Sequence, residues 1–194
     1  MASITQQTES YEMHRINPLP LRPNEAPIKL QRWSDLSAAQ KSQVRLLAID
    51  AQQVEYAGTA ERAIENVESD TQDDVAGIAI LKFAEIVGFL VLKRRSKAPA
   101  WASPTAAVVS AMRIDLVQQG LGIGSEALIA LSAWILVNWS SATELALSVD
   151  EENKRGIAAY TRAGFVDQGQ REQGRIGWVR YMKKQIVGVT RSAA

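Results

Sequence analysis

Cysteine is absent from this sequence, and histidine occurs once, as His14. The lack of cysteine excludes disulfides, thiol nucleophiles, cysteine-held zinc and iron–sulfur clusters. His14 lies in a proline-rich leader that we expect to be mobile, so neither a Ser–His–Asp hydrolase nor a histidine-ligated metal centre is expected. We therefore predict no metal site, and any chemistry has to come from other residue types.

A strong net charge and a long apolar run are also missing. The 22 basic and 21 acidic residues leave a net charge of +1, which gives no support for binding to nucleic acid or to an anionic membrane. The longest apolar helical stretch, 127–137, is too short to span a bilayer, and the polar residues 1–10 show no secretory signal. We therefore expect, by default, a cytoplasmic protein with no nucleic-acid and no membrane partner.

The sequence does contain an alternation of strand and helix patterns, over a length of 194 residues that suits one α/β domain. Residues 1–27 hold four of the six prolines and are expected to form a mobile N-terminal arm. A single domain is placed at 28–184, with a tail at 185–194. Strands are predicted at 28–33, 75–83, 86–93, 106–117, 144–149, 165–171 and 176–182. Helices are predicted at 36–48, 60–67, 125–137 and 153–163, with a bend over 52–58. Adjacent hairpins and one βαβ unit then give a mixed sheet with helices on both faces.

The segment 118–124, Gln-Gln-Gly-Leu-Gly-Ile-Gly, lies at the turn from the longest predicted strand into the most apolar predicted helix. Glycine permits φ > 0 and lets a ligand approach the backbone closely, because no Cβ is in the way. The free N–H groups at the start of the helix then point outward, at the positive end of the helix dipole. The turn is therefore a candidate phosphate or pyrophosphate site, although a glycine-rich turn without a ligand has the same pattern.

Two common phosphate-binding patterns fit this turn poorly. A P-loop requires a lysine after its last glycine, and none follows Gly124. A dinucleotide-binding fingerprint can be placed on Gly122, Gly124 and Ala127. Glu144 or Asp150 would then bind the ribose of the dinucleotide. Only one helix and three short strands are predicted after Glu144, however. The second half that such a fold requires is therefore missing.

A third pattern, Q/R-x-x-G-x-G/A, matches 119–124 without a gap, and so the turn resembles the coenzyme A pyrophosphate loop of the GNAT N-acetyltransferase superfamily. The residues before it, 112–115, are similar to the end of the family's fourth strand. One departure is Leu116, which stands where a proline is common in the family.

The region downstream carries a second resemblance to the same family. Asn153, Tyr160 and Gly164-Phe165 have the spacing of the signature N-x-x-A-x-x-x-Y-x-x-x-G-F. Gly156 replaces the alanine of that signature, which weakens a helix by about 1 kcal/mol but removes no functional group. With the glycine turn and this signature at the expected distance, the resemblance covers about residues 28–183.

The resemblance implies a mostly antiparallel central sheet with helices on both faces and a splayed pair of central strands. It also implies direct transfer of an acetyl group from acetyl-CoA to an amine, with no metal and no covalent enzyme intermediate. Backbone N–H groups of the turn would bind the pyrophosphate of the cosubstrate. The implied cofactor-binding residues are Met112, Ile114, Gln119, Gly120, Leu121, Gly122, Ile123, Gly124, Ser125 and Asn153.

Four residues receive specific roles from the resemblance. Met112 and Ile114 would pair with the pantetheine arm, and the N–H of Ile114 would polarise the thioester carbonyl. Asn153 would hydrogen-bond to the pantetheine arm, although asparagine is also a common helix N-cap. Tyr160, two helical turns after Asn153, would protonate the leaving thiolate as general acid, with a half-buried core tyrosine as the alternative.

The sequence defines the catalytic base and the amine that accepts the acetyl group less well. An alkylammonium with a pKa of ~10 must lose a proton before it attacks, and Glu55 is the candidate catalytic base. Asp50 and Asp115 are weaker choices, and Asp115 is better suited to bracing the turn. Eight acidic residues against one basic residue over 50–74 favour a small cationic amine as acceptor, unless they form only a solvated face. The alternative function is an inactive acyl-CoA-binding sensor or interaction module, and both a monomer and a homodimer are compatible with the sequence.

Overall fold

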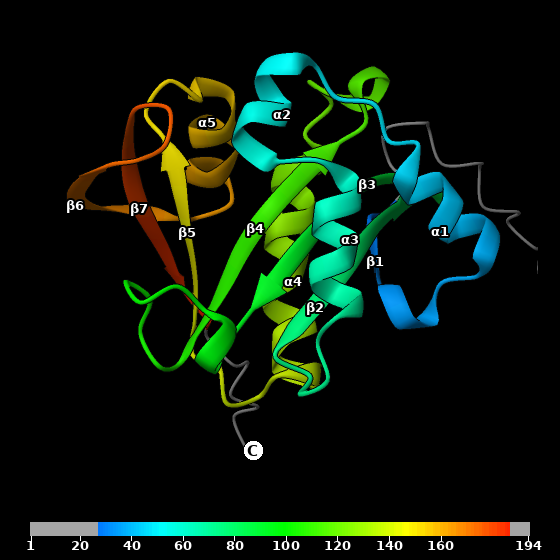
Figure 1. Cartoon of the computed structure of the whole chain (residues 1–194), viewed down its shortest axis with the longest axis horizontal. Helices are drawn as coiled ribbons and strands as arrows, with labels where there is room; N and C mark the ends of the chain where they lie inside the picture. Colours follow the sequence, from blue (N-terminus) through cyan, green and yellow to red (C-terminus); the bar gives the residue numbers. More distant parts are fainter. Residues whose placement is uncertain (1–26, 187–194) are drawn as a thin grey trace, which may run out of the picture.

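A computed structural model of the chain describes residues 27–186 (Figure 1). The predicted arm and tail lie outside these residues, apart from Pro27, Gln185 and Ile186. The limits that we predicted for the domain therefore stay predictions, and the following description concerns the part between them.

Seven strands form one mixed sheet in the order β1-β2-β3-β4-β5-β7-β6. Neighbouring strands are antiparallel except for β4 and β5, which are parallel. The strands are β1 Lys29–Arg32, β2 Val75–Lys82, β3 Glu85–Lys93, β4 Ala106–Ile114, β5 Glu144–Asp150, β6 Val166–Gln173 and β7 Trp178–Gln185. The predicted mixed, mostly antiparallel sheet is confirmed.

Helices cover both faces of the sheet, as predicted. They are α1 Ala38–Arg45, α2 Ala51–Ala57, α3 Ala60–Glu68, α4 Ile123–Asn138 and α5 Lys154–Arg162. On one face, Val44 of α1 and Ile64 of α3 join Phe89 of β3 in a buried cluster. On the other face, Leu128 and Ile135 of α4 form the centre of a larger buried cluster, and α3 and α4 therefore lie on opposite sides of the sheet in Figure 1. Within residues 27–186, no helix is long and apolar enough to cross a bilayer.

The first helix begins later than predicted because a side-chain cap sets its start. Ser37 accepts a hydrogen bond from the Gln40 N–H (3.2 Å), and the Gln40 side chain accepts one from the Ser37 N–H (3.0 Å). This reciprocal capping box places the first helical residue at Ala38. Residues 33–35, directly before the predicted start of the helix, form a short 3-10 turn.

The predicted bend over 52–58 is wrong, because this segment lies in helix α2. Asp50 supplies the N-cap by accepting a hydrogen bond from the Gln53 N–H (2.8 Å). Gly58, with φ of +72°, ends the helix and allows the chain to turn directly into α3. A short helix thus lies beside the end of β4, where the sequence pattern predicted none.

β4 ends at Ile114, three residues before the predicted limit, because Asp115 turns the chain. The Asp115 Oδ1 accepts a hydrogen bond from the Val117 N–H (3.2 Å), and its Oδ2 accepts one from the Ala48 N–H (3.1 Å). Asp115 therefore braces the turn and is not free to act as a base. A 3-10 turn over Leu116–Gln118 then leads into the glycine segment.

β4 and β5 separate along their length. Their Cα pairing runs only from Ala106–Val108 to Glu144–Ala146, and in the described chain no pairing joins the remainder of the two strands. A bulge accompanies the separation, with Ala111 in the left-handed region at φ of +50°. The predicted splayed pair of central strands is confirmed, and the sheet is open at the carboxyl ends of both strands.

Candidate functional site

A cavity of about 590 Å³ fills the opening between β4 and β5. Its walls come from α2, the end of β4, the glycine turn, the start of α4, and α5, which meet at this end of the sheet (Figure 1). Ten of the twelve site residues predicted from the sequence line it: Met112, Ile114, Gln119, Gly120, Gly122, Ile123, Gly124, Ser125, Asn153 and Tyr160. Leu121 and Glu55 are exposed and are not part of the lining.

The glycine turn presents unpaired backbone N–H groups. Gly120 and Gly122 have φ of +79° and +81°, a conformation that favours glycine. Gly122 is the N-cap of α4, and the first hydrogen bond of the helix joins the Glu126 N–H to the Gly122 carbonyl (3.1 Å). The three N–H groups from Ile123 to Ser125 therefore have no partner within the helix, which makes this turn suitable for an anion.

The side chain of Gln119 connects the turn to two other walls of the cavity. It donates a hydrogen bond to the Ile114 carbonyl (2.9 Å) and exchanges two hydrogen bonds with Gln53 of α2 (2.8 and 2.9 Å). These contacts fix the turn against both β4 and α2. Sequence reasoning missed Gln53, since nothing in the sequence indicates that α2 reaches a turn 66 residues away.

The direction of the Ile114 N–H follows from the pairing of β3 with β4. The next residue, Asp115, donates its N–H to the Val87 carbonyl (2.9 Å), toward β3. Since N–H groups alternate between the two edges of a strand, the Ile114 N–H points to the opposite edge, where β5 has moved away. A donor is thus available inside the opening, and its predicted role with a thioester carbonyl stays a prediction.

Asn153 forms the N-cap of α5, which was the structural alternative for this residue. Its Oδ1 accepts a hydrogen bond from the Gly156 N–H (2.9 Å), and the side chain also borders the cavity. The departure from alanine at Gly156 now has a physical reason. A Cβ at this position would lie 2.7 to 2.9 Å from the Asn153 side-chain atoms and would force the cap to move.

Tyr160 is half-buried on α5 and packs against Phe165, with 6.1 Å between the ring centroids. Its helix is held to the start of α4, because the Ser125 hydroxyl donates a hydrogen bond to the Ala159 carbonyl (3.1 Å). Burial raises the pKa of the Tyr160 phenol to about 12, so the hydroxyl is protonated at neutral pH. The residue can therefore act as a hydrogen-bond donor in the cavity.

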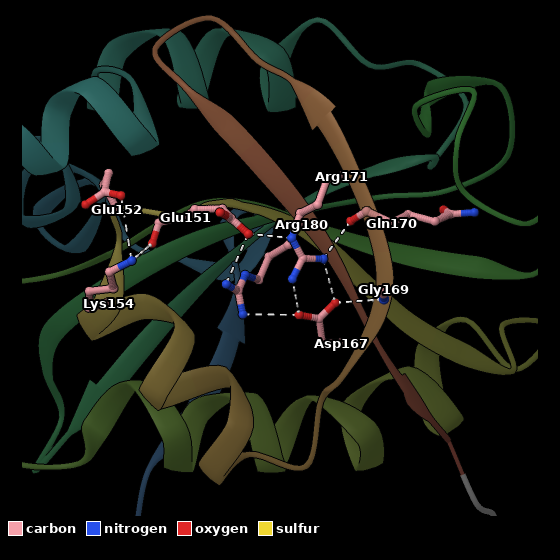
Figure 2. A network of polar contacts seen from close by, with 8 residues as sticks. All are labelled: Glu151, Glu152, Lys154, Asp167, Gly169, Gln170, Arg171 and Arg180. Carbon is pink, nitrogen blue, oxygen red and sulfur yellow. Dashed lines mark hydrogen bonds and ion pairs between the residues drawn. The ribbon is translucent and has the colours of Figure 1, made fainter.

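Ion pairs fix the turn that precedes α5 against the β6–β7 hairpin (Figure 2). Arg180 contacts Glu151 (3.2 Å) and Asp167 (3.1 Å), and Arg171 contacts the same two carboxylates, at 2.8 Å in the case of Asp167. Hydrogen bonds from Arg171 lower the pKa of Glu151 and of Asp167. The network lies two residues before Asn153 and positions the start of α5.

The structure does not bring the predicted base into the cavity. The Glu55 side chain is exposed on α2, and its backbone carbonyl accepts a hydrogen bond from Arg175. Asp50 is already engaged as the α2 cap. Asp150, which sequence reasoning considered only for a dinucleotide ribose, is the last residue of β5; it is not part of the cavity lining, and burial raises its pKa. Its raised pKa makes Asp150 a stronger base than an ordinary aspartate.

Half of the acidic residues that favoured a cationic acceptor take part in ion pairs, namely Glu68, Asp70, Asp73 and Asp74. Asp73 and Asp74 pair with Arg94 (3.3 and 3.0 Å) at the start of β2. This is the opposite end of the sheet from Ile114, since Val75 pairs with the last residue of β3. The charged residues that do line the cavity are Arg113, Arg155 and Arg162, and the described lining contains no carboxylate. None of these arginines was identified from the sequence, although Arg155 and Arg162 repeat the seven-residue spacing of Asn153 and Tyr160.

Comparison with known sequences identifies relatives. The sequence profile of the Acetyltransferase (GNAT) family matches residues 43–165, which is more than half of the chain. The uncharacterized N-acetyltransferase YbbJ of Bacillus subtilis (strain 168) is 30% identical over 102 residues. That match spans 52% of this chain and 64% of the relative, so it covers less than two thirds of the relative's length.

Solved structures share the fold. A structure of AAC(6')-Ib in complex with paromomycin and acetyl-CoA has a TM-score of 0.66 at 20% identity, covering 87% of this chain and 99% of that one. Spermidine N-acetyltransferase from Vibrio cholerae in complex with CoA and spermine has a TM-score of 0.62 at 14% identity, covering 82% and 95%. At these identities the likeness concerns the fold alone.

Proposed function

Because this chain belongs to the Acetyltransferase (GNAT) family, we propose that it transfers the acetyl group of acetyl-CoA to a primary amine of a small molecule by direct attack. The observation that carries the proposal is the cavity in which the glycine turn, the open edge of β4 and Tyr160 meet. The structural relatives with acetyl-CoA or CoA bound support the choice of cosubstrate.

In this proposal the phosphates of acetyl-CoA bind at the α4–α5 side of the cavity. The pyrophosphate accepts hydrogen bonds from the backbone N–H groups of Gly120 to Ser125, which have the positive end of the α4 dipole behind them. Arg155 and Arg162 lie two helical turns apart on α5 and border the same cavity. Their guanidinium groups add charge where the cosubstrate carries its phosphates.

The pantetheine arm then extends along the open edge of β4, beside Met112 and Ile114 and close to Asn153. Its amides form hydrogen bonds with the backbone of β4 beyond Val108, where β5 no longer pairs with this strand. The thioester carbonyl accepts a hydrogen bond from the Ile114 N–H, which stabilises the negative charge that develops on this oxygen when the amine attacks.

The reaction forms a C–N bond and breaks the C–S bond, with one proton removed from the amine and one supplied to the sulfur. Since the pKa of the Tyr160 phenol is about 12 and that of an alkyl thiol is about 8.5, complete transfer of the phenol proton to the thiolate is uphill. Tyr160 therefore donates a hydrogen bond to the departing sulfur, and the final proton can come from the new ammonium group through water.

The amine loses its proton to a carboxylate that acts directly or through water. Glu55 remains our candidate because its neighbours Gln53 and Tyr56 line the cavity, so water can link its exposed side chain to the amine. Asp150 is the second candidate, at the carboxyl end of the splayed strand. A pH profile of kcat/KM for Glu55→Gln and Asp150→Asn separates them, because only the base variant removes the acidic limb.

Thiol release from acetyl-CoA tests the proposal, with the full chain and a panel of polyamines, aminoglycosides, amino acids and peptides. We expect release that depends on both the protein and one class of amine, together with an acetylated product in mass spectrometry. Calorimetric binding of acetyl-CoA without release on any amine would instead indicate an acyl-CoA-binding sensor, and absence of binding would contradict both functions.

A further inference from the structure

Arg113 is a buried arginine in β4, between the two residues assigned to the pantetheine arm. Only 4% of its surface is exposed. Side chains alternate between the faces of a strand, so Arg113 points away from Met112 and Ile114 and toward α2. There its Nη2 donates hydrogen bonds to the carbonyls of Ala57 (3.4 Å), Gly58 (3.3 Å) and Thr59 (3.1 Å).

These contacts leave part of the guanidinium without a partner. Among residues 27–186, no carboxylate forms an ion pair with Arg113 within 4.0 Å, and its buried Nε has no hydrogen-bond acceptor. Burial lowers the pKa of Arg113, and attraction from the more distant Glu61 acts in the opposite direction. A buried charge that is satisfied only by three carbonyls is costly, and an anion in contact with it would offset that cost.

The position of Arg113 separates it from the phosphate region. It lines the cavity beside Tyr56 and Ala57 of α2, whereas Arg155 and Arg162 line it from α5, next to the glycine turn. The phosphates of the cosubstrate account for the two α5 arginines. They do not account for Arg113, whose contacts are with the link between α2 and α3.

We propose that Arg113 binds a carboxylate of the acceptor, so that the acceptor is an amine that also carries a carboxylate, as an amino acid or the carboxyl end of a peptide does. This inference rests on the proposed acetyl transfer and names the substrate class for it. It replaces the cationic acceptor that the acidic segment favoured, since no carboxylate of the described chain lines the cavity to receive a second positive charge. A guanidinium suits this partner because its N–H groups donate charge-assisted hydrogen bonds to a carboxylate.

The first test uses the unmodified protein and matched acceptors. Each amine is offered as the free amino acid, as its carboxamide and as the decarboxylated amine, and kcat/KM is measured by thiol release. We expect the acid to be preferred over both analogues by about 10-fold or more, since charge-assisted hydrogen bonds are about twice as strong as neutral ones. Equal or better use of the carboxamide would overturn the inference while leaving acetyl transfer intact. No thiol release above the amine-free background with any acceptor would instead refute the proposed function.

Variants then assign the preference to Arg113. Arg113→Gln keeps a donor for the α2–α3 carbonyls but removes the charge, and should abolish the preference for the acid with little change in acetyl-CoA affinity. Arg113→Lys keeps the charge and should retain part of the preference. Arg155→Gln is the matched control: it should bind acetyl-CoA more weakly, but the ratio of kcat/KM for the acid to kcat/KM for the carboxamide should not change. A preference that survives in a folded Arg113→Gln protein would remove Arg113 from this role. If that variant does not fold, the matched acceptors still decide the substrate class.

Discussion

The glycine turn offers the sharpest perturbation, a pair of substitutions that differ only in charge. Gly122 has φ of +81°, and a Cβ there would meet only the Glu126 Oε1 at 3.7 Å, so a short side chain fits without a collision. A non-glycine residue in the left-handed region costs about 1–2 kcal/mol, and asparagine and aspartate tolerate this region best. Gly122→Asn and Gly122→Asp should therefore both fold, with similar and modest losses of stability.

The two variants should differ strongly in their affinity for CoA. A carboxylate about 4 Å from a phosphate repels it by about 4 kcal/mol at an effective dielectric constant of about 20. Since Gly122 is exposed to solvent, we take about half of this value, which corresponds to a Kd about 30-fold higher for Asp than for Asn. The aspartate can also accept hydrogen bonds from the free N–H groups of the turn and so compete with the pyrophosphate.

Titration calorimetry with CoA measures this difference, and circular dichroism with a thermal melt confirms that both variants are folded. Raising the salt concentration should reduce the difference in CoA affinity between the two variants, because screening weakens the repulsion between the aspartate and the phosphate. If the folded Gly122→Asp protein bound CoA as tightly as Gly122→Asn, the pyrophosphate would not lie at this turn, and the reasoning about the site would be wrong.

Tyr160→Phe should lower kcat by about 10²-fold with similar acetyl-CoA affinity, and unchanged turnover would reduce Tyr160 to a packing role. Gly156→Ala should destabilise the protein although alanine is the better helix former, because its Cβ displaces the Asn153 cap; a rise in Tm would contradict this. Because the pKa values of Glu151 and Asp167 are lowered in the folded protein, their ion pairs stabilise the fold at pH values above the ordinary pKa of a carboxyl group. The melting temperature should therefore fall as the pH drops below about 4.5, and it should fall less in Asp167→Asn. The same change of melting temperature with pH in both proteins would exclude a contribution from this network.

The parts of the site that the sequence predicted depend on local residue patterns. Gly120 and Gly122 indicate a turn with φ > 0 before an apolar helix, and the turn has that conformation. Asn153 and Tyr160 are two turns apart on one helix, so their common face could be predicted from spacing alone. The splayed strands followed from the family resemblance, because no local pattern reveals where two strands stop pairing.

The parts that were missed depend on contacts between distant residues. Helix α2 is short, and its existence is decided by the Asp50 cap and Gly58, not by an apolar period. The hydrogen bonds of Arg113 reach residues more than 50 positions earlier in the chain. A count of acidic residues over 50–74 also does not show where their charges lie, because Asp74 pairs with Arg94 twenty positions away, at the opposite end of the sheet from Ile114.

A structure of the full chain with acetyl-CoA bound would show whether the opening between β4 and β5 holds the thioester. We expect the pyrophosphate on the N–H groups of Gly120 to Ser125, the pantetheine arm along β4, and the thioester oxygen within hydrogen-bond distance of the Ile114 N–H. Acetyl-CoA bound elsewhere on the molecule, or a thioester that points away from the Ile114 N–H and from Tyr160, would contradict this expectation.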